Sequence, residues 1–262
     1  MTIRIVAFLC ALSLGIACAA AVSADSAKRA GCTRLVLTGH PSYPPVAWAA
    51  GGTLEGAGIA LVRRLAKDAD IPIVVVNKGS WAAAQQAVRG GKADAIVGIY
   101  LTQERAKFLD YVRPAFAPDP SAVLVRANEH FVYKNWNSLI GKHGAVSAGE
   151  VYGARFDAFM HAKLTVRRVN GFAAVYQTII DKEADYGLAG YYPALTGAPK
   201  GKLKIVEPNF VTEGLYLAFG KSSPCSSKLS ARFSKDVARL IADGTVKRLM
   251  ATALSNYLAS PR

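Results

Sequence analysis

The first third of the chain alternates between strand-like and helix-like patterns of apolar residues. Arg34 to Gly39 and Ile71 to Val76 are short apolar runs typical of strands, and apolar residues at helical spacing predict a helix over Leu54 to Asp70. Ser80 is a good N-cap for a helix that ends at Val88, and Ala93 to Ile99 is apolar on both faces, as buried parallel strands are. This order predicts a parallel sheet with right-handed crossovers.

The second third of the chain has a similar pattern. The predicted elements are a strand at Ala145 to Ser147, a helix at Glu150 to His161, a strand at Leu164 to Val169, a helix at Phe172 to Asp181 and a strand at Asp185 to Ala189. A proline-rich loop, Pro114 to Pro120, leads into a predicted crossing strand at Ser121 to Arg126. Leu215 to Phe219 is the predicted return strand, followed by helices at Ser227 to Ala242 and Thr245 to Tyr257.

An internal repeat relates these two parts. At a constant offset, Trp81, Gln86, Asp94 and Tyr100 correspond to Phe172, Gln177, Asp185 and Tyr191. The repeat predicts two related α/β lobes with a cleft between them. We expect residues 33–120 and 213–262 to form lobe 1 and residues 121–212 to form lobe 2, and two chain crossings permit hinge closure. Only the first copy continues into Thr102-Gln103-Glu104-Arg105, so lobe 1 is expected to carry the main anion anchor.

The N-terminus predicts export. A lone Arg4 precedes an apolar run from Ile5 to Val22, and Val22-Ser23-Ala24 is a small-residue cleavage pattern. Residues 1–24 therefore resemble a cleaved secretory signal peptide, and the mature protein is expected in the periplasm. A retained membrane anchor or a lipoprotein is the less favoured alternative.

Cleavage would leave two cysteines, Cys32 and Cys225. In an oxidising periplasm they form a disulfide if the C-terminal segment returns beside the first strand; otherwise both are free thiols. The sequence leaves both alternatives open.

The charge composition limits the classes of molecule that the protein is expected to bind. The chain has 32 basic against 18 acidic side chains, a net charge of +14, which favours an anionic ligand or anionic lipid headgroups. The charges are dispersed, so most are expected on a solvated surface, and export argues against nucleic acid. The four histidines are scattered and no Cys-x-x-Cys motif occurs, so no metal site and no cofactor is predicted.

Motifs across the whole predicted mature chain resemble the family 3 extracellular solute-binding proteins. They include Tyr43-Pro44-Pro45, Gly91-Lys92-Ala93-Asp94, Thr102-Gln103-Glu104-Arg105, Leu109-Asp110-Tyr111, Ala148-Gly149 and Ala242-Asp243-Gly244-Thr245. The resemblance implies an α/β, two-lobed periplasmic-binding-protein type II fold with two crossover strands. It also implies a monomer that captures a small molecule at the cleft and delivers it to an ABC permease in the inner membrane, without catalysis.

The resemblance also implies the site. Arg105, one turn after a cap at Thr102, is expected to hold a ligand carboxylate, and Tyr43 and Trp81 are expected to form aromatic walls. Gly149 is expected to precede a helix N-terminus that meets the carboxylate from lobe 2. The expected ligand-binding residues are His40, Tyr43, Trp81, Gly98, Tyr100, Arg105, Gly149, Glu150 and Gly190. The alternative for Arg105 is a surface ion pair with Glu104 or Asp110, and for the aromatic residues a place in the core.

Four of these positions depart from the family pattern. Amino-acid binders of the family usually have an acidic residue, which receives the ligand ammonium, where this chain has Gly190. Tyr100 and Glu150 replace small hydroxyl residues, and His40 replaces an acidic or polar one. Three interpretations stay open: Glu150 receives the ammonium, the ligand has no ammonium, or Glu150 is only a helix-terminal carboxylate favoured by the dipole.

The function that follows is capture of a small polar or carboxylate-bearing solute, an amino acid or related organic anion, by lobe closure for an ABC importer. One alternative is an accessory or sensor binding protein for a periplasmic enzyme system. Another is a periplasmic dehydratase for prephenate or arogenate on the same scaffold, with Glu150 or Glu213 as its acid.

Overall fold

The first parallel sheet predicted from the sequence is present in the computed structural model, which describes residues 31–260. β1 (Leu35–Gly39) lies between β5 (Ile73–Val75) and β6 (Ala95–Ile99), and all three are parallel. Their connections are α1 (Ala57–Asp68) and α2 (Trp81–Arg89). The predicted signal peptide, residues 1–24, lies outside the described residues.

The first predicted helix begins later than expected. Leu54 belongs to β4 (Thr53–Glu55), which joins β3 (Ala47–Ala50) and β2 (Ser42–Tyr43) in a three-stranded antiparallel sheet that the sequence did not predict. Gly56 separates β4 from α1 with a φ of 130°, and a Cβ there would lie 2.4 Å from the Val46 carbonyl oxygen. Only glycine fits this junction, so the helix cannot extend back through it.

The second repeat builds a similar parallel arrangement. β9 (His143–Ser147) lies between β10 (Thr165–Val169) and β11 (Tyr186–Gly190), with the helices α4 (Ala154–Lys163) and α5 (Phe172–Ile180) in the connections. A short helix, α6 (Tyr191–Gly197), and a 3-10 turn at Trp136–Leu139 were not predicted.

Hydrogen bonds confirm that the two copies are structurally equivalent. The Asp94 carboxylate accepts a bond from the Val36 N–H at 2.8 Å, and Asp185 accepts the same bond from the His143 N–H at 2.8 Å. Each aspartate precedes the third strand of its copy and ties it to the neighbouring strand. Trp81 and Phe172 are the first residues of α2 and α5.

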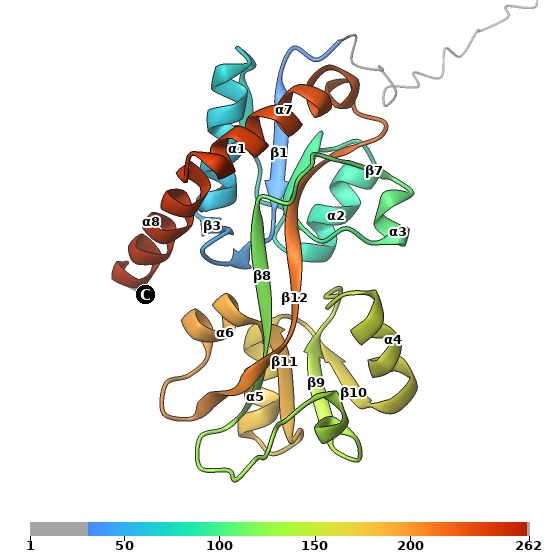
Figure 1. Cartoon of the computed structure of the whole chain (residues 1–262), viewed down its shortest axis with the longest axis vertical. Coiled ribbons are helices and arrows are strands. Elements are labelled where there is room, and N and C mark those ends of the chain that lie inside the picture. The colour runs from blue at the N-terminus through green and yellow to red at the C-terminus, as the bar shows by residue number, and fades with distance from the viewer. Residues whose placement is uncertain (1–30, 261–262) are drawn as a thin grey trace, which may run out of the picture. The chain divides into compact units, whose positions relative to one another are not determined.

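Two long strands join the two halves (Figure 1). β8 (Ala117–Arg126) and β12 (Leu203–Gly220) are antiparallel partners, and β12 also pairs with β6 and with the short β7 (Leu109–Tyr111). The strand order is β10-β9-β11-β8-β12-β6-β1-β5. The predicted α/β class and the two crossover strands are therefore confirmed, whereas the residue limits of the lobes stay a prediction.

Both crossover strands are longer than predicted. β12 spans 18 residues rather than Leu215 to Phe219, and β8 begins at Ala117, inside the predicted proline-rich loop. Pro118 and Pro120 pair with β12, while β11 reaches β8 only from Ser121 onward. Proline is tolerated here because one edge of the strand has no neighbouring strand that needs its N–H.

The C-terminal helices return to the first strand. α7 (Pro224–Ala242) and α8 (Thr245–Ala259) pack against α1, as Figure 1 shows. Cys225, in the first turn of α7, forms a disulfide with Cys32. The C-terminal segment therefore returns beside the first strand, which was the condition for a disulfide between these two cysteines.

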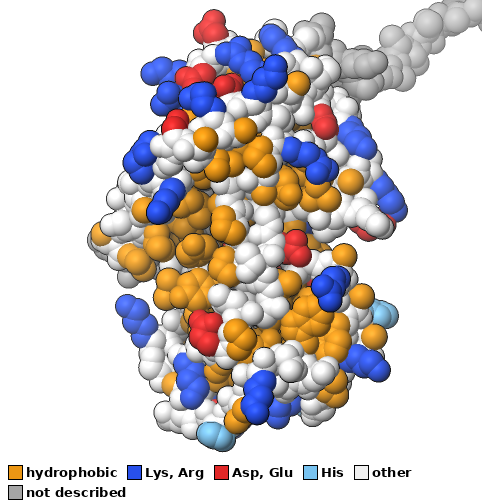
Figure 2. All heavy atoms as spheres, viewed as in Figure 1, with side chains coloured by type: hydrophobic (Ala, Val, Ile, Leu, Met, Phe, Trp, Pro, Cys, Tyr) orange, Lys and Arg blue, Asp and Glu red, His pale blue; other side chains and the backbone are white. Residues whose placement is uncertain are grey.

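The charged side chains are dispersed over the protein surface, as the sequence predicts. In Figure 2 the basic side chains are distributed over the visible face rather than collected in one patch. Several are paired, for example Arg64 with Asp68 at 3.0 Å and Lys107 with Glu104 at 2.6 Å. None of the helices between residues 31 and 260 has the length and apolar character that crossing a bilayer requires.

Candidate functional site

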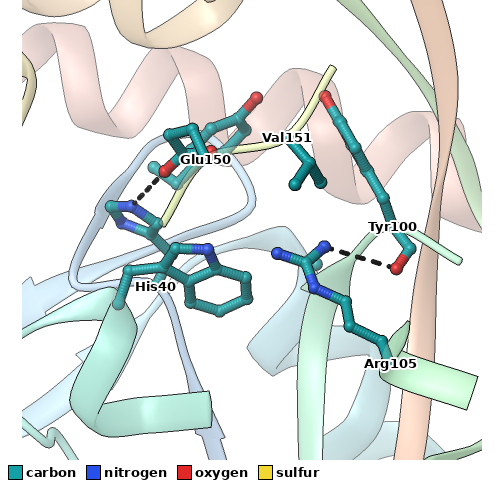
Figure 3. Close-up of a pocket in the computed structure, with 8 residues that line it drawn as sticks. His40, Tyr100, Arg105, Glu150 and Val151 are labelled. Atoms are coloured by element: carbon teal, nitrogen blue, oxygen red, sulfur yellow. Dashed lines mark hydrogen bonds and ion pairs between the residues drawn. The ribbon is translucent and has the colours of Figure 1, made fainter. Parts of the chain in front are cut away.

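A small cavity lies where residues of both repeats meet. It is lined by His40, Tyr43, Trp81, Gly98, Tyr100, Arg105, Glu150 and Val151, and its volume of ≈ 10 Å³ is about enough for one water molecule. Figure 3 shows the Arg105 guanidinium and the Glu150 side chain on different sides of this space. All of the predicted ligand-binding residues except Gly149 and Gly190 line the cavity.

Arg105 is a buried cation held by neutral groups. It lies in the short helix α3 (Gln103–Ala106), and the Thr102 hydroxyl caps this helix by accepting the Arg105 N–H at 3.1 Å, as predicted. The guanidinium donates to the Gln85 side-chain oxygen at 3.1 Å and to the Tyr100 carbonyl at 3.4 Å. It also lies 5.7 Å from the Trp81 ring centroid.

Arg105 does not form the alternative surface pair. Only 7 % of Arg105 is exposed, Glu104 pairs with Lys107, and Asp110 accepts a hydrogen bond from Ser226. Burial lowers the pKa of Arg105, an effect that the negative charge of Glu150 opposes. Within residues 31–260 no carboxylate lies at ion-pair distance from Arg105, so the site offers a desolvated fork for an external anion.

Glu150 and His40 connect the two repeats. The Glu150 carboxylate lies 3.2 Å from His40 Nε2, and 11 % of each side chain is exposed. His40 Nδ1 accepts the Ser42 N–H at 2.9 Å, so in this geometry it carries no proton and Nε2 donates to Glu150. The His40 ring also contacts Trp81 and Phe172, with centroids 5.2 and 5.8 Å away.

Phe172 is a neighbour of the site that the sequence analysis missed. Its position as the repeat counterpart of Trp81 was the available signal, because both residues begin helices that follow equivalent strands. A larger cavity of ≈ 550 Å³ continues from His40 and Trp81 towards Phe172, and the first residues of both helices line it. Gly149 lines this second cavity and not the first.

The predicted helix start at Glu150 is wrong, and so is the helix N-terminus after Gly149. α4 begins at Ala154 with Gly153 as its N-cap, and Gly153 has a φ of 101°, outside the helical region. The segment before the helix has no regular secondary structure and buries Tyr152, whose N–H donates to the Asp157 carboxylate at 3.0 Å. Glu150 is therefore not a carboxylate at a helix terminus, which removes one of the three interpretations of this residue.

Gly190 lies against Tyr43 rather than in the cavity wall. A Cβ added at Gly190 would lie 2.0 Å from the Tyr43 hydroxyl oxygen, so the phenol occupies the space of a side chain at that position. Gly190 ends β11 and pairs with Ser121 on β8. The glycine thus makes room for a tyrosine that lines the cavity.

Behind the two tyrosines lies a buried acid, Asp119, that the sequence analysis placed in a loop. The Tyr43 and Tyr100 hydroxyls both donate to Asp119 Oδ2, at 2.5 and 2.6 Å. Asp119 is 0 % exposed, and burial raises its pKa to about 7 although the two phenol hydrogen bonds lower it. Asp119 Oδ1 and Ser121 Oγ are buried without a hydrogen-bond partner among the described residues.

The arrangement suits binding of a small charged molecule. Arg105 offers one positive group, while Glu150 and the phenols in front of Asp119 make an opposite, negatively polarised wall. Aromatic rings at Trp81 and Tyr43 provide apolar contact. Across the part of the chain that the structure describes, no group of three His, Cys, Asp or Glu side chains could hold a metal ion.

Comparison with known proteins identifies the family. The model of the bacterial extracellular solute-binding proteins, family 3, matches residues 35–255. No curated protein matches the sequence.

Several solved structures are similar. An amino acid ABC transporter substrate-binding protein from Streptococcus pneumoniae, bound to L-arginine, is 18% identical with a TM-score of 0.74, over 87% of this chain and 97% of that chain. Holo ArgBP from T. maritima is 19% identical with a TM-score of 0.67, over 79% and 90%. A histidine kinase sensor domain with similarity to periplasmic binding proteins is 19% identical with a TM-score of 0.72, over 84% and 96%. At these identities the likeness shows the fold, and the predicted two-lobed type II periplasmic-binding-protein fold is confirmed.

Proposed function

The chain belongs to the bacterial extracellular solute-binding proteins of family 3, and we propose that it captures a small carboxylate-bearing solute between its lobes in the periplasm for an ABC permease of the inner membrane. The observation that carries this proposal is Arg105, a buried guanidinium with no carboxylate partner among residues 31–260. A buried cation of this kind is stabilised when a ligand carboxylate forms two parallel hydrogen bonds with it.

Capture requires movement of the lobes. The cavity of ≈ 10 Å³ is too small for an amino acid, and the Glu150–His40 contact closes it from the side of the second repeat. A ligand therefore enters when Glu150 and Val151 separate from the first lobe, and closure follows because the ligand has a higher affinity for the closed arrangement. The proposed lobes are residues 33–120 with 213–262, and residues 121–212.

The test is a ligand screen followed by one substitution. Amino acids, organic acids and polyamines are added to the mature protein in a thermal-shift screen, where a ligand at about a hundred times its Kd adds about 2.7 kcal/mol. Arg105→Ala should then weaken binding of the best carboxylate ligand more than ten-fold, since a charge-assisted hydrogen bond contributes about 1.5–3 kcal/mol.

Arg89→Ala is the matched control. It removes the same charge from an exposed position beside Phe108, away from the cavity, and should leave the affinity within about two-fold because exposed charges contribute little. Equal affinity in Arg105→Ala and wild type would refute the proposed carboxylate anchor.

A sensor or accessory protein is the second candidate, because the histidine kinase sensor domain shares the fold. The importer and sensor candidates differ in what a gene deletion does. Deletion should abolish high-affinity uptake of the radiolabelled ligand if the protein serves an importer. It should leave uptake unchanged and remove a transcriptional response if the protein serves a sensor.

A further inference from the structure

We propose that a groove beside the C-terminal helix α8 is a second small-molecule site, for an organic anion that carries an apolar chain and a single negative charge. The groove has a volume of ≈ 490 Å³, and small-molecule sites usually enclose about 300–1,000 Å³. It shares no lining residue with either of the two cavities that His40 and Trp81 line. The site therefore goes beyond the proposed function and does not depend on it.

Segments from three parts of the chain form the walls of the groove. Val246, Met250 and Leu254 are four residues apart on α8, so they lie on one face of the helix. The start of β8 contributes Pro118, and α6 contributes Tyr192. In Figure 1 α8 and α6 are both found on the left of β8. The groove is thus lined by a C-terminal helix, a crossover strand and a helix of the second predicted lobe.

The lining of the groove is apolar and remains accessible to solvent. Phe116 and Val246 are buried, Met250 and Leu254 are half-buried, and 37 % of Ile241 is exposed. Figure 2 shows apolar side chains gathered in the region of α8. Contiguous exposed apolar patches mark interaction sites and ligand-binding grooves. An apolar chain that fills the groove removes these side chains from water, which favours binding.

Lys247 supplies the charge of the groove. Among the described residues that line the groove it is the only charged one, and its side chain is exposed. The ion pairs within residues 31–260 do not include Lys247. Asp243, the nearest acid in the sequence, accepts the Thr245 N–H at 2.8 Å and lies 3.9 Å from Arg239. Lys247 is therefore available to an external anion.

The position of Lys247 on α8 strengthens the attraction for an anion. The residue lies in the first turn of the helix, which contains no acidic residue, and the N-cap Gly244 provides no side-chain hydrogen bond. The backbone N–H groups at this end of a helix carry a partial positive charge, to which the lysine adds. Apolar walls with one positive end match an anion that has an apolar chain, whereas a cation is repelled.

The groove and the cavity at Arg105 are separated by β8. Pro118 lines the groove, whereas the next residue, Asp119, accepts hydrogen bonds from Tyr43 and Tyr100, which line the cavity. Neighbouring residues of a strand point to opposite faces of the sheet. The two sites therefore lie on opposite sides of this strand, so that an occupied groove leaves the cavity free.

Calorimetry of the mature protein at pH 7.5 with octanoate as the probe tests the site. Octanoate has an apolar chain and one negative charge, and one molecule should bind per chain. Acetate lacks the chain, and octylammonium carries the opposite charge. Both should bind at least about ten-fold more weakly than octanoate, because each lacks one of the two features that the groove recognises.

Two substitutions in the groove are compared with matched controls, and melting is followed for each variant. Leu254→Glu adds a negative charge to the groove and should weaken octanoate binding at least about ten-fold. Lys247→Gln should weaken it about three- to five-fold, because an exposed charge contributes little; it alters an exposed side chain and carries the test should Leu254→Glu not fold. Leu258→Glu and Lys235→Gln make the same changes at exposed positions outside the lining and should bind octanoate as wild type does.

Arg105→Ala separates this site from the cleft. It removes the proposed carboxylate anchor and should leave octanoate binding unchanged, since Arg105 does not line the groove. Wild-type affinity in both Leu254→Glu and Lys247→Gln overturns the groove site; if Arg105→Ala then loses octanoate, the probe binds in the cleft and the proposed function is supported. If octanoate does not bind wild type, or binds no more tightly than octylammonium, the groove site is wrong and the proposed function stands or falls by its own test.

Discussion

Asp119→Asn should change how the stability of the protein depends on pH, in the absence of any added ligand. Asp119 is fully buried, and its surroundings supply phenol hydrogen bonds but no cation within the described chain. Burial therefore penalises the ionised carboxylate. The pH dependence of folding measures that penalty directly, which makes it independent of the ligand experiments.

The magnitude follows from the pKa. A rise from 3.8 to about 7 corresponds to about 4 kcal/mol at about 1.4 kcal/mol per pH step. Between these two values the folded protein keeps the proton that the unfolded chain has lost, so the free energy of unfolding falls as the pH rises. The contribution of the retained Asp119 proton to the free energy of unfolding is complete below about pH 4 and is lost as the pH passes about 7. From pH 5 to pH 8 the free energy of unfolding falls by about 2.5 kcal/mol.

Urea unfolding of wild type and Asp119→Asn at pH 5 and pH 8 provides the assay. An uncharged Asn lacks this slope, so the stability of the variant relative to wild type should improve by about 2.5 kcal/mol from pH 5 to pH 8. Glu104→Gln is the control, because it removes one negative charge from an exposed surface pair. Identical pH slopes in wild type and Asp119→Asn would show that the carboxyl ionises in the folded protein without penalty and would refute the reasoning.

Two further predictions concern covalent and steric constraints. Replacing Cys32 and Cys225 with Ser in the mature protein, residues 25–262, should lower the free energy of unfolding by about 2–5 kcal/mol in urea titrations. The denatured, unreduced mature protein should show no free thiol, and two titrating thiols would contradict the disulfide. Gly190→Ala should lower the melting temperature and weaken ligand binding, because the new Cβ must displace Tyr43. Gly52→Ala is the control: the space around its Cβ is open, so neither the melting temperature nor the affinity should change. If Gly190→Ala binds the ligand as tightly as wild type, Tyr43 lies outside the binding site.

Sequence patterns predicted the helices and strands whose limits depend on residues close together in the chain. α2, β6 and α5 lie within about two residues of their predicted limits, since a helix cap at Ser80 or an unbroken apolar run is recorded in the sequence itself. The first part of β12 was missed because its residues are mostly partly exposed and include Pro208. Its pairing with β8 depends on a segment far away in the sequence, which no local pattern records.

Some residues of the site were predicted and others were not, because contacts between distant segments leave no local pattern in the sequence. Family resemblance placed Arg105, Tyr43 and Trp81 at the cavity that they line. Asp119 was not found, because its flanking residues Pro118 and Pro120 are typical of a loop. The fold brings two hydroxyl groups to Asp119, from Tyr43 and Tyr100, which are far from it in the sequence.

The two charged groups that line the cavity, Arg105 and Glu150, come from different repeats, and in the proposed mechanism this gives closure a role in selectivity. Arg105 is held by Gln85, Tyr100 and Thr102, all from the first repeat, so a carboxylate can bind before the lobes meet. Glu150 completes the cavity only on closure, since that residue comes from the second repeat. On the proposed closure Glu150 therefore brings a negative charge towards an anion bound in the first lobe, and we expect a ligand that also carries a positive group to be held more tightly. A ligand shifts a conformational equilibrium only by its differential affinity for the two states, and in this proposal that difference depends on the charge that the ligand presents to Glu150.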